Sequence, residues 1–277
     1  PTRRSSDLEV TWQQCIHFAT STGGGVNYLC RQHGFTLRII DVGVDYDFPP
    51  ELPIIPRKVG RGTRNFLHEP AMTTDELDAC IAHGAEAVRA VHEAGCNVVS
   101  LGEMGIGNTS PASLLLARLA GLPIEQVVGP GAGLDAAGRQ RKIQVLGQVL
   151  ERHAQATEPL DALAALGGFE IATLAGAVLQ AALESRVIVV DGFITSSAVL
   201  VAARLQPAVL ERCVFSHVSA EPGHRLMLQA MQADPLLQFG MRLGEGSAAA
   251  LVWPLLESAC RALNEIAPLE KVMARGA

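Results

Sequence analysis

The sequence predicts an α/β fold in which helices rich in small residues cover a buried parallel sheet. The hydrophobic share of the 277 residues is 48% whereas the aromatic share is only 4%, and Ala, Leu, Val and Gly dominate. This mixture suits alanine-rich helices on a parallel sheet better than an all-β fold. Short apolar runs also alternate with helical stretches, which is the order of strand–helix–strand units.

The expected elements follow from local signals along the chain. Helical periodicity begins near Glu9, and Thr74 is expected to cap a helix whose first turn is acidic. The expected strands are 35–40, 98–101, 186–190 and 213–215. The expected helices are 74–94, 111–120, one that carries Lys142, 170–183, 196–205, and an apolar one from about 247 to 266.

Composition also limits the class of function. The net charge of −6 argues against a nucleic-acid surface, so a phosphorylated ligand would be held by amides and a few placed cations. No apolar run approaches the length of a membrane span and no signal peptide is visible, which predicts a cytoplasmic protein. The cysteines contain no C-x-x-C pair and are interpreted as buried, reduced side chains. They are Cys15, Cys30, Cys80, Cys96, Cys213 and Cys260.

The stretch 97–121 has the order strand, glycine loop and helix N-terminus. Gly102, Gly105 and Gly107 follow the apolar run, Ser110 is expected to be the N-cap of the next helix, and Gly121 stops that helix. Free amides and the helix dipole at such a point can bind an anion. The stretch is neither a Walker P-loop nor the dinucleotide fingerprint, because the Lys-Ser/Thr pair and the third glycine are missing. A tight turn without a ligand is the alternative.

Polar residues follow several of the expected strands. The apolar runs end at Asp41, Glu103, Asp191 and the pair 216–217. If these strands belong to one parallel sheet, their carboxyl ends share an edge, where ligands bind in α/β folds. We therefore expect one site there, although each residue taken singly is as well explained as a turn residue.

Six segments together resemble one enzyme family, the nicotinate-nucleotide–dimethylbenzimidazole phosphoribosyltransferases. They lie in register at 62–65 with 70–72, 102–109, 168–170, 191–193, 216–221 and 242–247. The resemblance implies transfer of phosphoribose from nicotinate mononucleotide to 5,6-dimethylbenzimidazole or a related base. The products would be α-ribazole 5′-phosphate and nicotinate, in assembly of the lower ligand of cobalamin. It also implies a homodimer and neither a metal nor a redox cofactor.

The resemblance further implies a Rossmann-like parallel sheet with flanking helices in a large α/β domain at 35–239. A small helical domain would be built from both chain ends, 9–34 and 240–277. The first eight residues, PTRRSSDL, match the translated end of a common sequencing adapter. We expect 1–8 to be a non-native segment joined to an N-terminally incomplete frame.

The resemblance assigns site residues by position. Glu245, between two glycines, is expected to be the catalytic base that takes the proton of the incoming base; a helix-capping role is the alternative. Base binding is expected from Gln14, Leu243 and Gly244. Phosphate and ribose binding is expected from Glu103, Gly105, Gly107, Asn108, Thr109, Lys142, Asp191 and Ser219. Structural hydrogen bonds are an alternative for Glu103 and Asp191, and a solvated helix lysine is one for Lys142.

Two other functions are considered. A dinucleotide-dependent oxidoreductase is disfavoured because Ser110 stands where the third glycine of the fingerprint should be. A catalytically silent nucleotide- or base-binding protein of the same fold is disfavoured by Glu245, because such a protein does not need a base.

Overall fold

The strands form two separate parallel sheets in the computed structural model, which describes residues 5–91, 94–131 and 133–267. The central sheet has the order β3-β4-β5, and Leu101, Val190 and Phe215 are aligned at its carboxyl edge. The second sheet pairs β1 with β2. The strand bounds are β1 (Ile39–Asp41), β2 (Ile54–Pro56), β3 (Val98–Leu101), β4 (Val187–Val190) and β5 (Cys213–Phe215).

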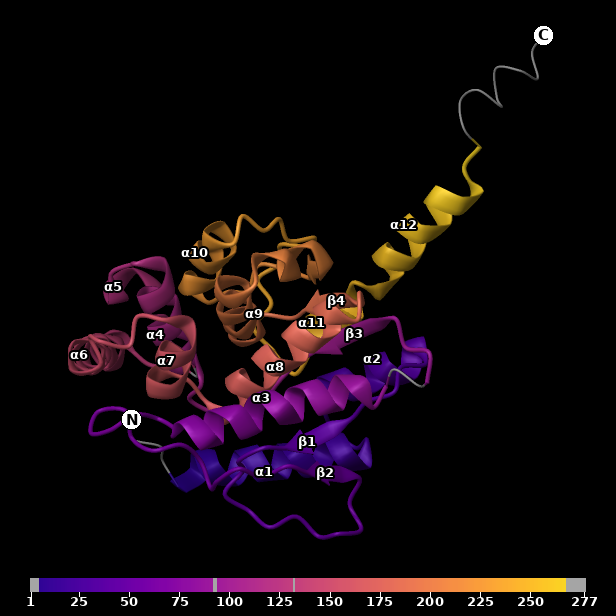
Figure 1. Ribbon diagram of the computed structural model, residues 1–277. Helices are drawn as coiled ribbons and strands as arrows, with labels where there is room; N and C mark the ends of the chain where they lie inside the picture. The colour runs from indigo at the N-terminus through magenta and orange to yellow at the C-terminus, as the bar shows by residue number, and fades with distance from the viewer. Residues whose placement is uncertain (1–4, 92–93, 132, 268–277) are drawn as a thin grey trace.

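Helices surround the central sheet, and the last of them projects from the body (Figure 1). The bounds are α1 (Ser5–Thr20), α2 (Gly25–His33), α3 (Thr74–Arg89), α4 (Thr109–Ala120), α5 (Ile124–Val127), α6 (Ala136–Arg152), α7 (Pro159–Leu166), α8 (Phe169–Leu183), α9 (Phe193–Leu205), the 3₁₀ helix η1 (Pro207–Arg212), α10 (Pro222–Ala230), α11 (Ser247–Leu251) and α12 (Trp253–Glu265).

Glycines let the core helices α3 and α8 pack closely. Helices α3 and α8 lie along each other (Figure 1), and a Cβ added to Gly84 of α3 would lie 1.9 Å from the Thr173 carbonyl oxygen of α8. In return, a Cβ on Gly176 would lie 2.2 Å from the Ile81 carbonyl oxygen. Helix α9 is buried from Phe193 through Ala203. Helices this apolar all round need small residues to approach one another, which explains the alanine-rich composition.

The α/β prediction is confirmed, and most expected elements appear within a few residues. Gly121 ends α4 in the left-handed region, with φ of 65°. The predicted N-caps were wrong by one and two positions. Thr73 caps α3, because its side chain and Glu76 form a reciprocal capping box. Asn108 stands at the N-cap position of α4 in place of Ser110.

The structure corrects the expectation that Asp41 shares an edge with Glu103 and Asp191. Asp41 ends β1, which belongs to the second sheet. Its carboxylate instead binds Lys58 at 2.8 Å. The apolar run before Asp41 looks like the runs of the other strands. A short apolar run predicts a strand but does not specify which strand it pairs with, so the sequence did not reveal the second sheet.

The expected C-terminal helix is two helices. α11 ends at Leu251 and α12 begins at Trp253, with Pro254 in its first turn. Proline lacks the N–H that would continue the hydrogen-bond ladder of α11, which accounts for the break.

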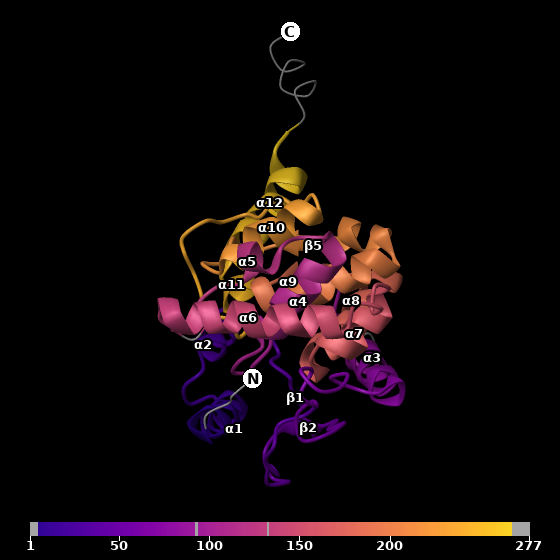
Figure 2. The ribbon, with the colours of Figure 1, turned by 90° about the vertical axis from the view of Figure 1, so that its left-hand side faces the viewer.

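Segments from the two chain ends meet, since α2 packs against α11. Figure 2 shows α1, β1 and β2 on one side of the body and α12 on the other. The division into 35–239 and a small domain from 9–34 and 240–277 stays a prediction; of the latter, 268–277 lie outside the described residues. Residues 1–4 of the octapeptide also lie outside them, and 5–8 begin α1. Within the described ranges, no helix combines the length and apolarity needed to cross a bilayer.

Candidate functional site

Glu245 lies in a strained loop before α11. Gly244, Glu245 and Gly246 have φ of 76°, 65° and 78°, all in the left-handed region. For a non-glycine residue this conformation costs about 1–3 kcal/mol, so it persists only where the surrounding contacts hold it. The loop therefore fixes the direction of the Glu245 side chain by its backbone.

The Glu245 carboxylate is held by the N-terminal helices. Its Oε1 accepts a 3.1 Å hydrogen bond from Gln14 Nε2 of α1, and its Oε2 accepts a 2.8 Å bond from the Gly25 amide, the first of α2. Burial raises the pKa of Glu245, against the amides of Gly25 and Val26 and the Gln14 side chain, which lower it. A half-buried carboxylate with a raised pKa is a stronger base than an exposed one. The structure brings the predicted base-binding residue Gln14 into contact with the predicted catalytic base Glu245.

Asp191 supports the same loop from the end of β4. Its Oδ2 accepts a hydrogen bond from the Gly246 amide at 3.2 Å, and its Oδ1 accepts bonds from the Ala248 and Ala249 amides at 2.9 and 3.3 Å. Asp191 is thus a cap for the N-terminus of α11 that comes from a distant strand. These bonds favour its structural alternative, and a direct contact with ribose stays a prediction.

Two glycines let the neighbouring backbone reach this loop. A Cβ on Gly102 would lie 2.4 Å from the Gly246 amide nitrogen, and one on Gly25 would lie 2.7 Å from Leu243 Cδ2. A side chain at position 102 would push the backbone of the 243–246 segment away, whereas one at position 25 would displace the Leu243 side chain. Leu243, predicted to bind the base, is 57% exposed beside Gly25.

Glu103 joins the Glu245 loop to the glycine-rich stretch. Its carboxylate accepts a hydrogen bond from Asn108 Nδ2, and a Cβ on Gly244 would lie 3.6 Å from its Oε1. Burial raises the pKa of Glu103 to about 8; Asn108 lowers it, while Glu170, Asp191 and Glu245 raise it further. Gly105 is also close, since a Cβ there would lie 2.9 Å from Asn108 Nδ2. An excess of carboxyl groups in one place suits a ligand atom that carries positive charge.

Lys142 meets the N-terminus of α4. Its Nζ lies 3.0 Å from Thr109 Oγ1, and Gly107, with φ of 95°, turns the chain just before the helix. A Cβ on Gly131 would lie 2.9 Å from the same Thr109 oxygen. Burial lowers the pKa of Lys142, which the Glu221 carboxylate opposes. The predicted anion site thus brings one cation to the first amides of a helix.

Ser219 is positioned by a buried histidine. The Ser219 amide donates to His224 Nδ1 at 2.9 Å, and Ser196 Oγ lies 3.0 Å from His224 Nε2. Burial lowers the pKa of His224 to about 3, so this histidine is neutral. Because its Nδ1 accepts the Ser219 amide, its proton is on Nε2. Ser219, which is predicted to bind phosphate or ribose, therefore lies on a fixed loop next to Glu221.

Two acidic residues near the site were not predicted. Glu221 faces Lys142, and its Oε2 is buried without a hydrogen-bond partner among the described residues. Glu170, at the start of α8, raises the pKa of Glu103. Glu170 lies in the segment 168–170 and Glu221 in the segment 216–221, which both carry the family resemblance. That resemblance was the signal by which the two residues could have been predicted.

The pKa of Glu103 predicts how stability depends on pH. Its folded-state pKa of about 8 lies above the ordinary 4.5. Between these values the unfolded chain has lost the proton that the folded chain keeps, so stability is present at low pH and falls as pH rises through about 8. Glu103→Gln should remove this loss, so the difference in Tm between variant and wild type should grow in favour of the variant from pH 5 to pH 9. A difference that stays constant with pH would contradict the burial of Glu103.

Comparison with known proteins identifies the family. A phosphoribosyltransferase family model matches residues 4–273. The nicotinate-nucleotide–dimethylbenzimidazole phosphoribosyltransferase of Variovorax paradoxus (strain S110) is 56% identical over 262 residues, 95% of this chain and 74% of that protein. The enzyme of that name from Bacteroides fragilis (strain YCH46) is 49% identical over 261 residues, 94% of this chain and 75% of that one. The crystal structure of the Thermus thermophilus enzyme matches with a TM-score of 0.89 at 35% identity, covering 96% of this chain and 78% of that chain. The chain therefore belongs to the nicotinate-nucleotide–dimethylbenzimidazole phosphoribosyltransferase family.

Proposed function

We propose that this protein transfers phosphoribose from nicotinate mononucleotide to 5,6-dimethylbenzimidazole or a related base. The products are α-ribazole 5′-phosphate and nicotinate, and the reaction serves lower-ligand assembly of cobalamin. One observation carries the proposal: Glu245, which is bonded to Gln14, adjoins Gly244, and Gly244 lies beside Glu103. Glu103 in turn binds Asn108, whose neighbour Thr109 meets Lys142. A carboxylate that can accept a proton from the incoming base and an anion-binding site thus lie at the same edge of the sheet.

The roles follow from chemistry along this line. The 5′-phosphate binds Lys142 and the amides that begin α4, which fixes the ribose. A benzimidazole nitrogen attacks C1′ while the bond to nicotinate breaks, and its electron pair neutralises the departing pyridinium. Positive charge that develops on the ribose lowers the pKa of the adjacent Glu103, so this carboxyl group ionises and stabilises the charge. Glu245 takes the proton from the other benzimidazole nitrogen.

The base lies between the Glu245 loop and the N-terminal helices in this proposal. Gln14 and Leu243 flank the carboxylate from α1 and from the loop, and Gly244 leaves space beside Glu103. Because the Glu245 backbone is already strained and its carboxylate already bonded, little ordering remains to be done when the base binds.

We also propose that the protein is a homodimer. Helix α12 has no buried residue, and its apolar side chains Leu255, Leu263 and Ile266, the last just beyond its end, are 48%, 86% and 71% exposed. Figure 1 shows this helix reaching away from the body. A second copy would cover this apolar surface.

The test is nicotinate release from nicotinate mononucleotide, measured with and without 5,6-dimethylbenzimidazole. Release should depend on the base and should match the amount of α-ribazole 5′-phosphate formed. Nicotinate release at the same rate with and without 5,6-dimethylbenzimidazole would indicate a hydrolase. Binding of both compounds without any release would favour the alternative, a silent binding protein.

A further inference from the structure

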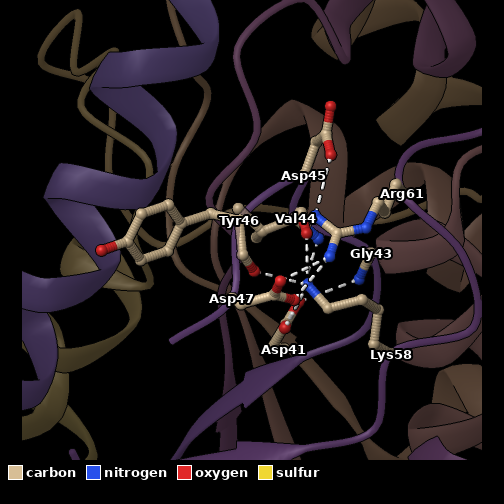
Figure 3. Close-up of polar contacts among 8 residues, drawn as sticks. All are labelled: Asp41, Gly43, Val44, Asp45, Tyr46, Asp47, Lys58 and Arg61. Carbon is tan, nitrogen blue, oxygen red and sulfur yellow. Dashed lines mark hydrogen bonds and ion pairs between the residues drawn. The ribbon is translucent and has the colours of Figure 1, made fainter. Parts of the chain in front are cut away.

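The loop between β1 and β2 is closed by a lysine that uses all three of its N–H donors. Lys58 Nζ binds Asp41 Oδ2 at 2.8 Å and also donates to the carbonyl oxygens of Val44 and Tyr46, the latter at 2.7 Å (Figure 3). Asp41 Oδ1 accepts the amides of Gly43 and Val44 at 3.1 and 2.9 Å. An ammonium group has three donors, so Lys58 has none left for a ligand. Its role is to fix the loop.

A second cation closes the outer side of the loop. Arg61 donates to Asp45 at 3.2 Å and to both oxygens of Asp47 at 2.6 Å. An exposed pair of this kind adds little stability by itself, but the planar guanidinium fixes the geometry of the two carboxylates. Lys58 and Arg61 thus both bind the segment 44–47 (Figure 3).

The clamped loop presents the Tyr46 ring to α1. Figure 3 shows this ring turned away from the lysine. Trp12 of α1 stacks on it with ring centroids 4.5 Å apart and an interplanar angle of 9°. Cys15, one turn further along α1, is buried next to Asp41 and Lys58, which both influence its pKa. One face of α1 therefore rests on the clamped loop.

The opposite face of α1 carries Gln14. Residues 12 and 14 of a helix point about 200° apart, so the helix separates Trp12 from Gln14. Gln14 reaches Glu245 at 3.1 Å. Any shift of α1 away from Tyr46 would change this contact, because the helix moves as a rigid rod.

We propose that the Lys58-clamped loop is a positioning device for the proposed catalytic carboxylate: Tyr46 supports Trp12, Trp12 fixes α1, and α1 sets Gln14 against Glu245. Tyr46 and Lys58 are positioning residues, since neither touches the reacting atoms. The kinetic part of this inference rests on the proposed function. The structural part, that Tyr46 and Lys58 fix Trp12, does not.

The kinetic test compares Tyr46→Ala with Tyr46→Phe. Tyr46→Ala should lower kcat/KM for 5,6-dimethylbenzimidazole about tenfold or more, toward the ~10²-fold that a misplacement of about 1 Å costs. The KM for nicotinate mononucleotide should stay nearly unchanged. The acid limb of the pH profile should move to higher pH, because Gln14 helps to keep the pKa of Glu245 down. Tyr46→Phe retains the ring and should behave as wild type.

Matched controls separate positioning from general damage. Tyr28→Ala removes the other tyrosine of the chain, which is 52% exposed on α2, and should leave the kinetics unchanged. If Tyr46→Ala does not fold, Tyr46→Leu keeps apolar bulk without the stacking plane and takes its place. Wild-type kinetics in the variant, or an equal loss for both substrates, would overturn the proposal.

A double-mutant cycle tests the route through Gln14. In a Gln14→Ala background, Tyr46→Ala should have little further effect on kcat/KM, because residues that act through one contact are not additive. Full additivity of the two effects would overturn the route.

Fluorescence gives a readout that does not need activity. The chain has two tryptophans, so Trp253→Phe leaves Trp12 as the single emitter. Quenching of Trp12 by acrylamide should rise in both Tyr46→Ala and Lys58→Met and stay at the parent level in Tyr28→Ala. No rise in Lys58→Met would overturn the clamp, whether or not the wild type transfers phosphoribose.

Discussion

Replacing Glu245 with glutamine should lower the turnover rate roughly 10²–10⁴-fold, the usual contribution of one positioned acid–base group. Glutamine keeps the volume of the Glu245 side chain and can still accept the hydrogen bond from the Gly25 amide, but it cannot take a proton. Binding of nicotinate mononucleotide should change little, since its phosphate is held around Lys142. The measurement is steady-state formation of α-ribazole 5′-phosphate, with binding of nicotinate mononucleotide followed by calorimetry.

The pH profile of the wild type checks the same assignment. A base acts only when ionised, and the pKa of Glu245 lies above its ordinary value. The rate should therefore fall as pH decreases through this raised pKa, and Glu245→Gln should lose that limb. The defect should also shrink with an incoming base that ionises more readily, because less proton removal is asked of the protein.

Controls separate the loss of a base from a loss of fold. A thermal melt of Glu245→Gln should match that of the wild type, and Glu211→Gln, an exposed change in η1, should have normal kinetics. A folded Glu245→Gln protein with near-normal turnover would end the assignment. Glu103 would then be the next carboxylate to test.

Removing the Lys142 side chain should weaken nicotinate mononucleotide selectively. Loss of one charge-assisted contact costs about 1.5–3 kcal/mol, which corresponds to roughly a 10- to 150-fold rise in its Kd. Binding of 5,6-dimethylbenzimidazole should be unaffected, because this base carries no phosphate. Calorimetric titration of Lys142→Ala with each compound measures both effects.

The matched control for Lys142→Ala is Arg141→Ala. Arg141 is the adjacent cation on α6 and is exposed, so its loss removes the same charge from a solvated position. Its effect on nicotinate mononucleotide should be small and should vanish with added salt. Equal weakening of both substrates by Lys142→Ala would place this lysine outside the phosphate site.

Local signals in the sequence were sufficient for much of the fold. The run 213–215 is a strand as expected, and Gly121 ends α4 because a left-handed C-cap favours glycine. Cap positions were harder to predict. Thr73 and Thr74 are adjacent, and either side chain could accept a hydrogen bond from a backbone amide of the first turn. The break between α11 and α12 was missed although Pro254 was visible in the sequence.

The sequence by itself determined the fold class, the glycine-rich turn before α4 and, through six segments in register, the family. Periodicity and glycine act on neighbouring residues, so the fold class and the turn can be inferred from local sequence, whereas the family follows from the order of the six segments along the chain. Only the tertiary structure decided that Asp191 caps α11, that Asp41 belongs to a second sheet, and that Gln14 meets Glu245 across 231 positions. Contacts between distant segments depend on strand order and helix packing, which are set by burial of the whole core and not by any one segment.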